Sequence, residues 1–158
     1  MSDDETFETV DAGSSHTFPI AAGDLKKGDH VCIKGFPCRV VEVTTSKTGK
    51  HGHAKANITA IDIFTGRKYE EVAPTSHSLP APFVNKVELQ LIDIGADGAL
   101  SLLDEDNNER NDMNLPPDEE LADRIKRDFE AAKDIAVIVQ SAMGTQQVVG
   151  YKVAGQNQ

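Results

Sequence analysis

The sequence has no tryptophan, only two cysteines and no long apolar run. A membrane-spanning helix needs about 20 apolar residues, and a signal peptide begins with positive charge. Residues 1–17 instead hold five acids and no base. Cys32 and Cys38 are too few for a disulfide framework, and their spacing is unusual for zinc. We therefore expect a cytoplasmic protein without a membrane span, in which both thiols are buried.

Positive charge is also scarce, since the net charge is −10. A total of this sign argues against a nucleic-acid partner, because binding phosphates requires cations. The charges are segregated, however: residues 24–55 carry a net +4, residues 56–84 a net −1 and residues 85–158 a net −8. A basic segment can bind RNA within an acidic chain, although charge alone describes a merely solvated face equally well.

The first half of the sequence predicts a small β domain. Residues 1–17 indicate a disordered acidic tail. Short runs of β-branched residues then alternate with turns, Thr65-Gly66 indicates a hairpin, and no helix longer than one turn is expected before Val84. Three prolines in residues 73–82 suggest a stiff connector. The first domain is therefore expected over residues 18–83.

The second half, residues 84–158, predicts a second β domain with one helix. The helix is expected from Pro116 to about Lys133, with Leu121, Ile125 and Phe129 as its buried stripe. Alternating segments predict strands over residues 86–94, 99–103, 135–139 and 147–153. Five short strands with a helix before the last two are typical of an OB-fold barrel. The fold class expected for the whole chain is mainly β, with two small barrels.

Residues 44–53 form a polar segment between two expected strands. It contains no apolar side chain and is longer than a hairpin needs, which is typical of a binding loop. Gly49 and Gly52 flank Lys50 and His51, so a sharp turn with positive φ angles can direct these two side chains outward. A lysine at such a tip combines reach with charge.

Other motifs in this region are weaker. A phosphate-binding P-loop needs a glycine where Thr44 stands and a serine or threonine where His51 stands. His51 and His53 could bind a metal, but no third ligand lies near them in the sequence, so no metal site is expected. The glycosylation sequon at Asn57 lies in an expected strand and should be silent.

The segment Ser46-Lys47-Thr48-Gly49-Lys50-His51-Gly52-His53-Ala54-Lys55 resembles the hypusination loop of the translation initiation factor 5A family. The resemblance covers nearly the whole chain beyond the acidic tail and departs mainly in residues 104–118 and at the carboxyl end. It continues through residues 61–66, 68–70, 90–92, 100–103 and 141–143.

This resemblance implies an SH3-like N-terminal barrel and a C-terminal OB-fold barrel, in a translation factor that is not an enzyme and has no catalytic residue. It implies that Lys50 is converted to hypusine. Deoxyhypusine synthase would transfer an aminobutyl group of spermidine to the ε-amine, and deoxyhypusine hydroxylase would complete the change. No other cofactor is implied. The other residues expected in the modification loop are Ser46, Lys47, Thr48, Gly49, His51, Gly52 and His53.

The resemblance also implies a place on the ribosome. Family members, like their archaeal counterparts and the related bacterial elongation factor P, act near the exit site of the large subunit. There the modified lysine approaches the acceptor end of peptidyl-tRNA and promotes slow peptide bonds, as at proline runs, and termination. The RNA-binding residues expected on this basis are Lys47, Lys50, Lys55 and Lys34.

Two other functions stay open. An OB-fold barrel could serve as a single-strand RNA-binding module, although base stacking needs exposed aromatic residues and aromatics make up only 5% of the chain. An enzyme could use the loop lysine covalently, but catalytic lysines are normally desolvated, whereas a polar loop exposes Lys50.

The loop glycines generate a first prediction. Gly52→Val should impair modification of Lys50, because a β-branched residue resists positive φ. Intact-mass measurement of both proteins after incubation with deoxyhypusine synthase and spermidine checks this, and an unchanged modification rate would contradict the expected turn.

Overall fold

The computed structural model describes residues 16–47 and 54–155. The chain divides into two units, Met1–Val84 and Asn85–Gln158, each with its own core. The second unit begins at Asn85, one residue after the domain start expected at Val84. In the described residues no helix is long and apolar enough to cross a membrane.

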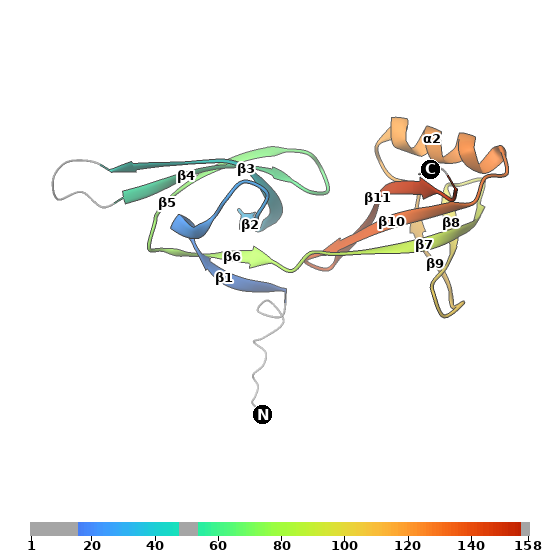
Figure 1. Cartoon of the computed structure of the whole chain (residues 1–158), viewed down its shortest axis with the longest axis horizontal. Coiled ribbons are helices and arrows are strands. Elements are labelled where there is room, and N and C mark those ends of the chain that lie inside the picture. Colours follow the sequence, from blue (N-terminus) through green and yellow to red (C-terminus); the bar gives the residue numbers. More distant parts are fainter. Residues whose placement is uncertain (1–15, 48–53, 156–158) are drawn as a thin grey trace, which may run out of the picture. The chain divides into compact units, whose positions relative to one another are not determined.

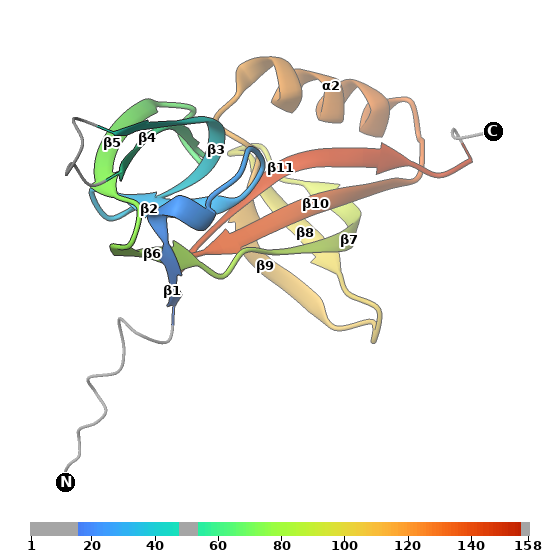
Figure 2. The same ribbon diagram turned by 60° about the vertical axis from the view of Figure 1, so that its left-hand side comes forward.

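The first unit is a small β barrel built from two antiparallel sheets. A four-stranded sheet has the order β2-β3-β4-β5, and a two-stranded sheet pairs β1 with β6. Figure 2 looks into this unit, with β3, β4 and β5 on one side and β1 and β6 on the other. The elements are β1 (Thr17–Ala21), the 3-10 turn η1 (Ala22–Asp24), β2 (His30–Ile33), β3 (Phe36–Lys47), β4 (Ala54–Asp62), β5 (Lys68–Pro74) and β6 (Ser78–Pro82).

The core of the first unit comes from strand alternation. In β4 every second residue from Ala56 to Asp62 is buried, because successive side chains of a strand point to opposite faces. Ile58 is 1% exposed and packs with Val31, Ile33 and Val40. Full burial of one such side chain contributes about 1.5–3 kcal/mol.

The expected proline-rich connector over residues 73–82 is wrong. Pro74 is the last residue of β5, and β6 pairs with β1 in register, with Pro80 opposite Pro19. Proline lacks an N–H donor but is tolerated on edge strands, and a two-stranded sheet consists of edges. The expected tail over residues 1–17 is also too long at its end, because Thr17 belongs to β1.

The second unit is an antiparallel barrel with one helix, as expected. Four of its five strands correspond to the ranges expected from the sequence, and the fifth, Glu109–Asn114, does not. The strand order is β11-β10-β7-β8-β9. Helix α2 lies along one side of the unit (Figure 1) and packs Leu121 and Ile125 into its core. The elements are β7 (Asn85–Ile94), β8 (Ala99–Leu103), β9 (Glu109–Asn114), α2 (Glu119–Glu130), β10 (Ile135–Ala142) and β11 (Thr145–Val153).

Helix α2 begins and ends with defined polar contacts. Asp118 caps it, since its side chain accepts hydrogen bonds from the backbone N–H groups of Glu120 and Leu121. Near its end, the Tyr151 hydroxyl of β11 donates to Asp128 at 2.7 Å. This bond, with the Lys133 ammonium beside it, lowers the pKa of Asp128 and joins the helix to the sheet.

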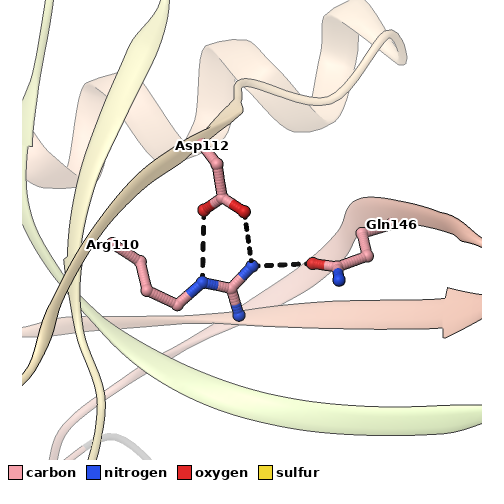
Figure 3. Close-up of polar contacts among 3 residues, drawn as sticks. All are labelled: Arg110, Asp112 and Gln146. Carbon is pink, nitrogen blue, oxygen red and sulfur yellow. Dashed lines mark hydrogen bonds and ion pairs between the residues drawn. The ribbon is translucent and has the colours of Figure 1, made fainter.

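Polar side chains link the two outer strands of the second sheet. The Arg110 guanidinium of β9 pairs with Asp112 through two contacts of 3.2 and 3.0 Å, and its Nη2 donates to Gln146 Oε1 of β11 at 2.7 Å (Figure 3). Since β9 and β11 are the two ends of the sheet order, this bridge lies where the barrel closes.

Both cysteines are buried and carry thiols, as expected. Burial raises the pKa of Cys32, and it raises that of Cys38 from 9.0 to about 11, with the nearby Asp62 charge adding to the effect. The folded state therefore favours the protonated Cys38 thiol. The stability that depends on this proton is complete below pH 9 and is lost as the pH approaches 11.

We therefore expect the free energy of unfolding to fall by about 2 kcal/mol between pH 9 and pH 11 through Cys38. Urea titrations across this interval measure the slope. Cys38→Ala should lower stability overall, because it leaves a cavity, and should flatten the alkaline decline. An equally steep decline in Cys38→Ala would contradict this assignment.

The hairpin expected at Thr65-Gly66 is present and depends on Asp62. Its Oδ1 accepts from the backbone N–H groups of Phe64 at 2.8 Å and Thr65 at 3.1 Å, while Gly66 has a φ of +78°. Asp62 is 4% exposed, and its replacement by alanine would leave the part-buried amides of Phe64 and Thr65 without this acceptor.

Asp62→Ala should lower the free energy of unfolding of the first unit by about 1–3 kcal/mol. Asp62→Asn keeps an acceptor oxygen and should lose much less. The two tyrosines of the chain lie in different units, so tyrosine fluorescence in a Tyr151→Phe background follows Tyr69 and the first unit alone. Equal stability of Asp62→Ala and the parent protein would contradict this role.

Candidate functional site: the β3–β4 arm

The polar segment singled out in the sequence lies at the end of a long hairpin formed by β3 and β4. Their antiparallel register runs continuously from Val43↔Ile58 to Lys47↔Ala54. Strand β2 pairs only with the beginning of β3, so the end of β3 has β4 as its one partner in the sheet. We call residues 43–47 and 54–58 the arm. It begins in the core of the first unit, where Ala56 and Ile58 are buried, and extends away from it (Figure 1).

Contacts on β4 brace the arm. The Asn57 side-chain amide donates to the carbonyl of Thr44 and to Ser46 Oγ, both at 3.4 Å, and so crosses from one strand to the other. The Thr75 N–H donates to the Ala54 carbonyl at 3.0 Å, which fixes the start of β4 to the chain after β5. Strand β4 is therefore held by β3 on one side and by the chain after β5 on the other, as far as Ala54.

The arm carries positive charge without a carboxylate. Lys47 and Lys55 are exposed, and Lys55 lies opposite Ser46 in the register. No Asp or Glu occurs in residues 43–47 or 54–58, although Glu42 precedes the arm at its base and Glu71 of β5 pairs with Ile58. Lysines in this arrangement can contact phosphate groups. General acid–base chemistry would need a carboxylate or histidine beside them, and the described residues of the arm include neither, so the geometry suits binding.

The structure brings together Ser46, Lys47 and Lys55 among the residues predicted for the site. Lys34 is separate from them, because it lies in the turn before the first residue of β3, whereas Lys47 is the last residue of β3. The remaining predicted residues, Thr48, Gly49, Lys50, His51, Gly52 and His53, lie outside the described residues.

The expected loop over residues 44–53 is wrong at its beginning. Thr44 to Lys47 continue β3 and pair with β4, so the connection between the two strands is residues 48–53. Polar residues such as threonine and serine are compatible with an exposed strand, and a pattern that seeks apolar alternation does not detect them. The ladder therefore reaches closer to Lys50 than the sequence indicates.

Sequence reasoning also missed the function of Asn57 in the site. The sequence marks Asn57 only as part of a sequon, whereas in the structure its side chain bridges the two strands of the arm. One signal was available: within the expected strand, Asn57 follows the alternation that buries Ala56 and Ile58 and therefore lies on the opposite face.

Two family models match the chain. One, described as translation initiation factor 5A-like, N-terminal, covers residues 15–77. The other, described as eukaryotic elongation factor 5A hypusine, DNA-binding OB fold, covers residues 83–152. The first model contains the arm, and the second coincides with the five-stranded barrel and its helix.

Curated relatives match over nearly their whole length. Eukaryotic translation initiation factor 5A-3 of Arabidopsis thaliana is 54% identical over 156 residues, which cover 98% of this chain and 99% of the relative. Eukaryotic translation initiation factor 5A of Zea mays is 52% identical over 158 residues, with 98% and 99% covered.

Solved structures agree with the fold described above. A translation initiation factor 5A family protein from Naegleria fowleri is 54% identical, has a TM-score of 0.82, and matches over 87% of this chain and 99% of its own. Eukaryotic translation initiation factor 5A from Methanococcus jannaschii is 28% identical, with a TM-score of 0.68 and coverage of 87% and 96%. Two family models, identities above 50% over nearly full-length relatives and two matching folds show that this chain belongs to the eukaryotic translation initiation factor 5A family.

Proposed function

We propose that this protein is a cytoplasmic translation factor that acts on the ribosome through hypusine at Lys50. The observation that supports this most directly is the arm: an antiparallel ladder, cationic and free of carboxylates, that runs up to Lys47 and Ala54. Lys50 is the third residue after this ladder ends. A lysine lengthened by the aminobutyl group of spermidine would therefore extend from a braced hairpin.

The proposed partner is the large ribosomal subunit near the exit site, together with peptidyl-tRNA. A peptidyl-tRNA that reacts slowly spends time in unproductive orientations, and holding it in place can remove several kcal/mol of entropic barrier. Hypusine would act by reach and charge on phosphate or ribose oxygens of the acceptor end. Lys47 and Lys55 would contact the RNA backbone, which positions the arm without reading sequence.

This function requires no catalytic residue in the protein. The peptide bond would still be formed by the ribosome, and the factor would accelerate slow steps, such as those at proline runs and in termination, by orienting a substrate. Deoxyhypusine synthase and deoxyhypusine hydroxylase would be its modifying enzymes, and no cofactor other than the hypusine itself is proposed. The second unit carries a net −8 over residues 85–158, which argues against that unit as the main RNA-binding surface.

Lys50→Arg tests the proposal. Arginine keeps the charge but offers no ε-amine for the aminobutyl group, so modification should be absent and synthesis through a proline run should fall to the rate without the factor. A reconstituted translation reaction measures the rate, and intact mass measures modification.

Lys47→Arg is the matched control, because it makes the same change on the described part of the same arm. It should keep both the modification and nearly the parent rate, since a backbone contact tolerates either cation. Full stimulation by unmodified Lys50→Arg protein would refute the proposed role of hypusine.

A further inference from the structure

Two aromatic rings, one of them exposed, lie stacked at the opposite end of β3 from the arm. The rings of Phe36, the first residue of β3, and Tyr69 of β5 are 5.5 Å apart and nearly parallel, at 12°. Tyr69 packs against the core of the first unit, which holds its ring in place. Phe36 is not part of that core and remains 46% exposed, so its ring presents an apolar planar surface to solvent.

A cation accompanies this pair. The Lys34 Nζ lies 6.0 Å from the centroid of the Tyr69 ring, within the range of a cation–π contact. Lys34 and Gly35 form the two-residue turn between Ile33 and Phe36, with φ angles of +54° and +86°.

The backbone at Lys34 is unfavourable for lysine. Turns of this kind prefer asparagine or glycine at the first position, because a left-handed conformation is costly for other residues. A lysine at this position is therefore not explained by the turn itself. Strain of this sort is a reason to look for a function of the side chain.

The surroundings are cationic. Residues 34–39 and 65–69 contain Lys34, Arg39, Arg67 and Lys68 and no Asp or Glu, whereas Glu70 and Glu71 follow directly after Tyr69. By strand alternation Glu70 lies on the opposite face of β5 from Tyr69, and Glu71 lies on the same face two residues farther along. Arg67 and Lys68 are exposed in the turn and strand that lead to Tyr69. The nearest acid in sequence before this turn, Asp62, is buried and accepts hydrogen bonds from backbone amides, so it does not offset these charges at the surface.

We propose that Lys34, Phe36 and Tyr69 form a binding site for an unpaired nucleotide of single-stranded RNA. The base stacks on the exposed ring of Phe36, and Lys34, Arg67 and Lys68 contact the flanking phosphates. A planar aromatic surface recognises a base, and the cations recognise the backbone that carries it. The site is separate from the arm and does not depend on the modification of Lys50.

The test uses the full chain with unmodified Lys50 and a fluorescently labelled oligouridylate, measured by anisotropy at several salt concentrations. Phe36→Leu keeps an apolar side chain but removes the stacking face, and binding should weaken about tenfold. Lys34→Asn should weaken binding and reduce the slope of log K against log salt by about one. Asparagine suits the turn better, so the same variant should be at least as resistant to urea as the parent protein.

The matched control is a second exposed aromatic pair. Phe83 is 51% exposed and its ring lies 5.0 Å from that of Phe18, but among the described residues no lysine or arginine lies over either ring. Phe83→Leu should leave oligouridylate binding unchanged. Cross-linking with 5-iodouridine oligomers, followed by peptide mapping, should place the cross-link on Phe36 or Tyr69.

Several outcomes overturn the proposal. These are no measurable oligouridylate binding by the parent protein, unchanged binding by Phe36→Leu, an equal loss with Phe83→Leu, or cross-links only outside residues 34–39 and 65–69. Competition by a polyaspartate peptide as strong as that by unlabelled oligouridylate would assign the surface to charge alone and would also overturn it. The Lys50→Arg translation assay is independent of all these results.

Discussion

The antiparallel pairing of β3 with β4 is the constraint on which the rest of the first unit depends. The same two strands bury Val40 and Ile58 in the core and carry Lys47 and Ala54 at their far ends. A bulge between Val40 and Glu42 shifts the register once, and beyond it the pairing is regular. If the pairing of β3 with β4 shifted by one residue, every side chain of the shifted strand would move to the other face of the sheet. The burial of the core residues therefore also fixes which side chains face outward along the arm.

This coupling explains how a long polar hairpin is kept in a defined conformation. An isolated two-stranded hairpin is marginally stable in water, so the arm needs support from elsewhere. The support comes from β5, which pairs with β4 from Lys55↔Pro74 to Ile58↔Glu71, and from the buried residues of β4. The Asn57 bridge between the strands and the Thr75 hydrogen bond at Ala54 add to it. A side chain that must orient a large substrate gains little if its own base moves, so bracing up to the last paired residues matters for the proposed function.

The sequence predicted the features that depend on local physical chemistry. The Thr65-Gly66 hairpin, the helix with Leu121 and Ile125 inward, and two β units follow from turn residues and apolar periodicity, and the structure confirms them. Features that depend on tertiary pairing were not predictable in this way. β6 is rich in proline and becomes a strand only because β1 lies beside it, and β9 is polar with Met113 as its one buried residue, so neither shows a strand pattern. The end of β3 lacks apolar alternation, and the Asn57 bridge depends on which residue of β3 the register places opposite it.

The distribution of charge shows why the total charge is a poor guide to this molecule. A net −10 would repel RNA if it were spread evenly, but fields fall off within about 10 Å at moderate salt, so a ligand responds mainly to nearby groups. Both ends of β3 lie in stretches with cations and no carboxylate: Lys47 and Lys55 at one end, Lys34 and Arg39 at the other. The acidic residues are concentrated in residues 1–17 and 85–158. An acidic chain of this kind would limit non-specific binding to RNA, and the two cationic regions near the ends of β3 are the places where the proposed contacts would form.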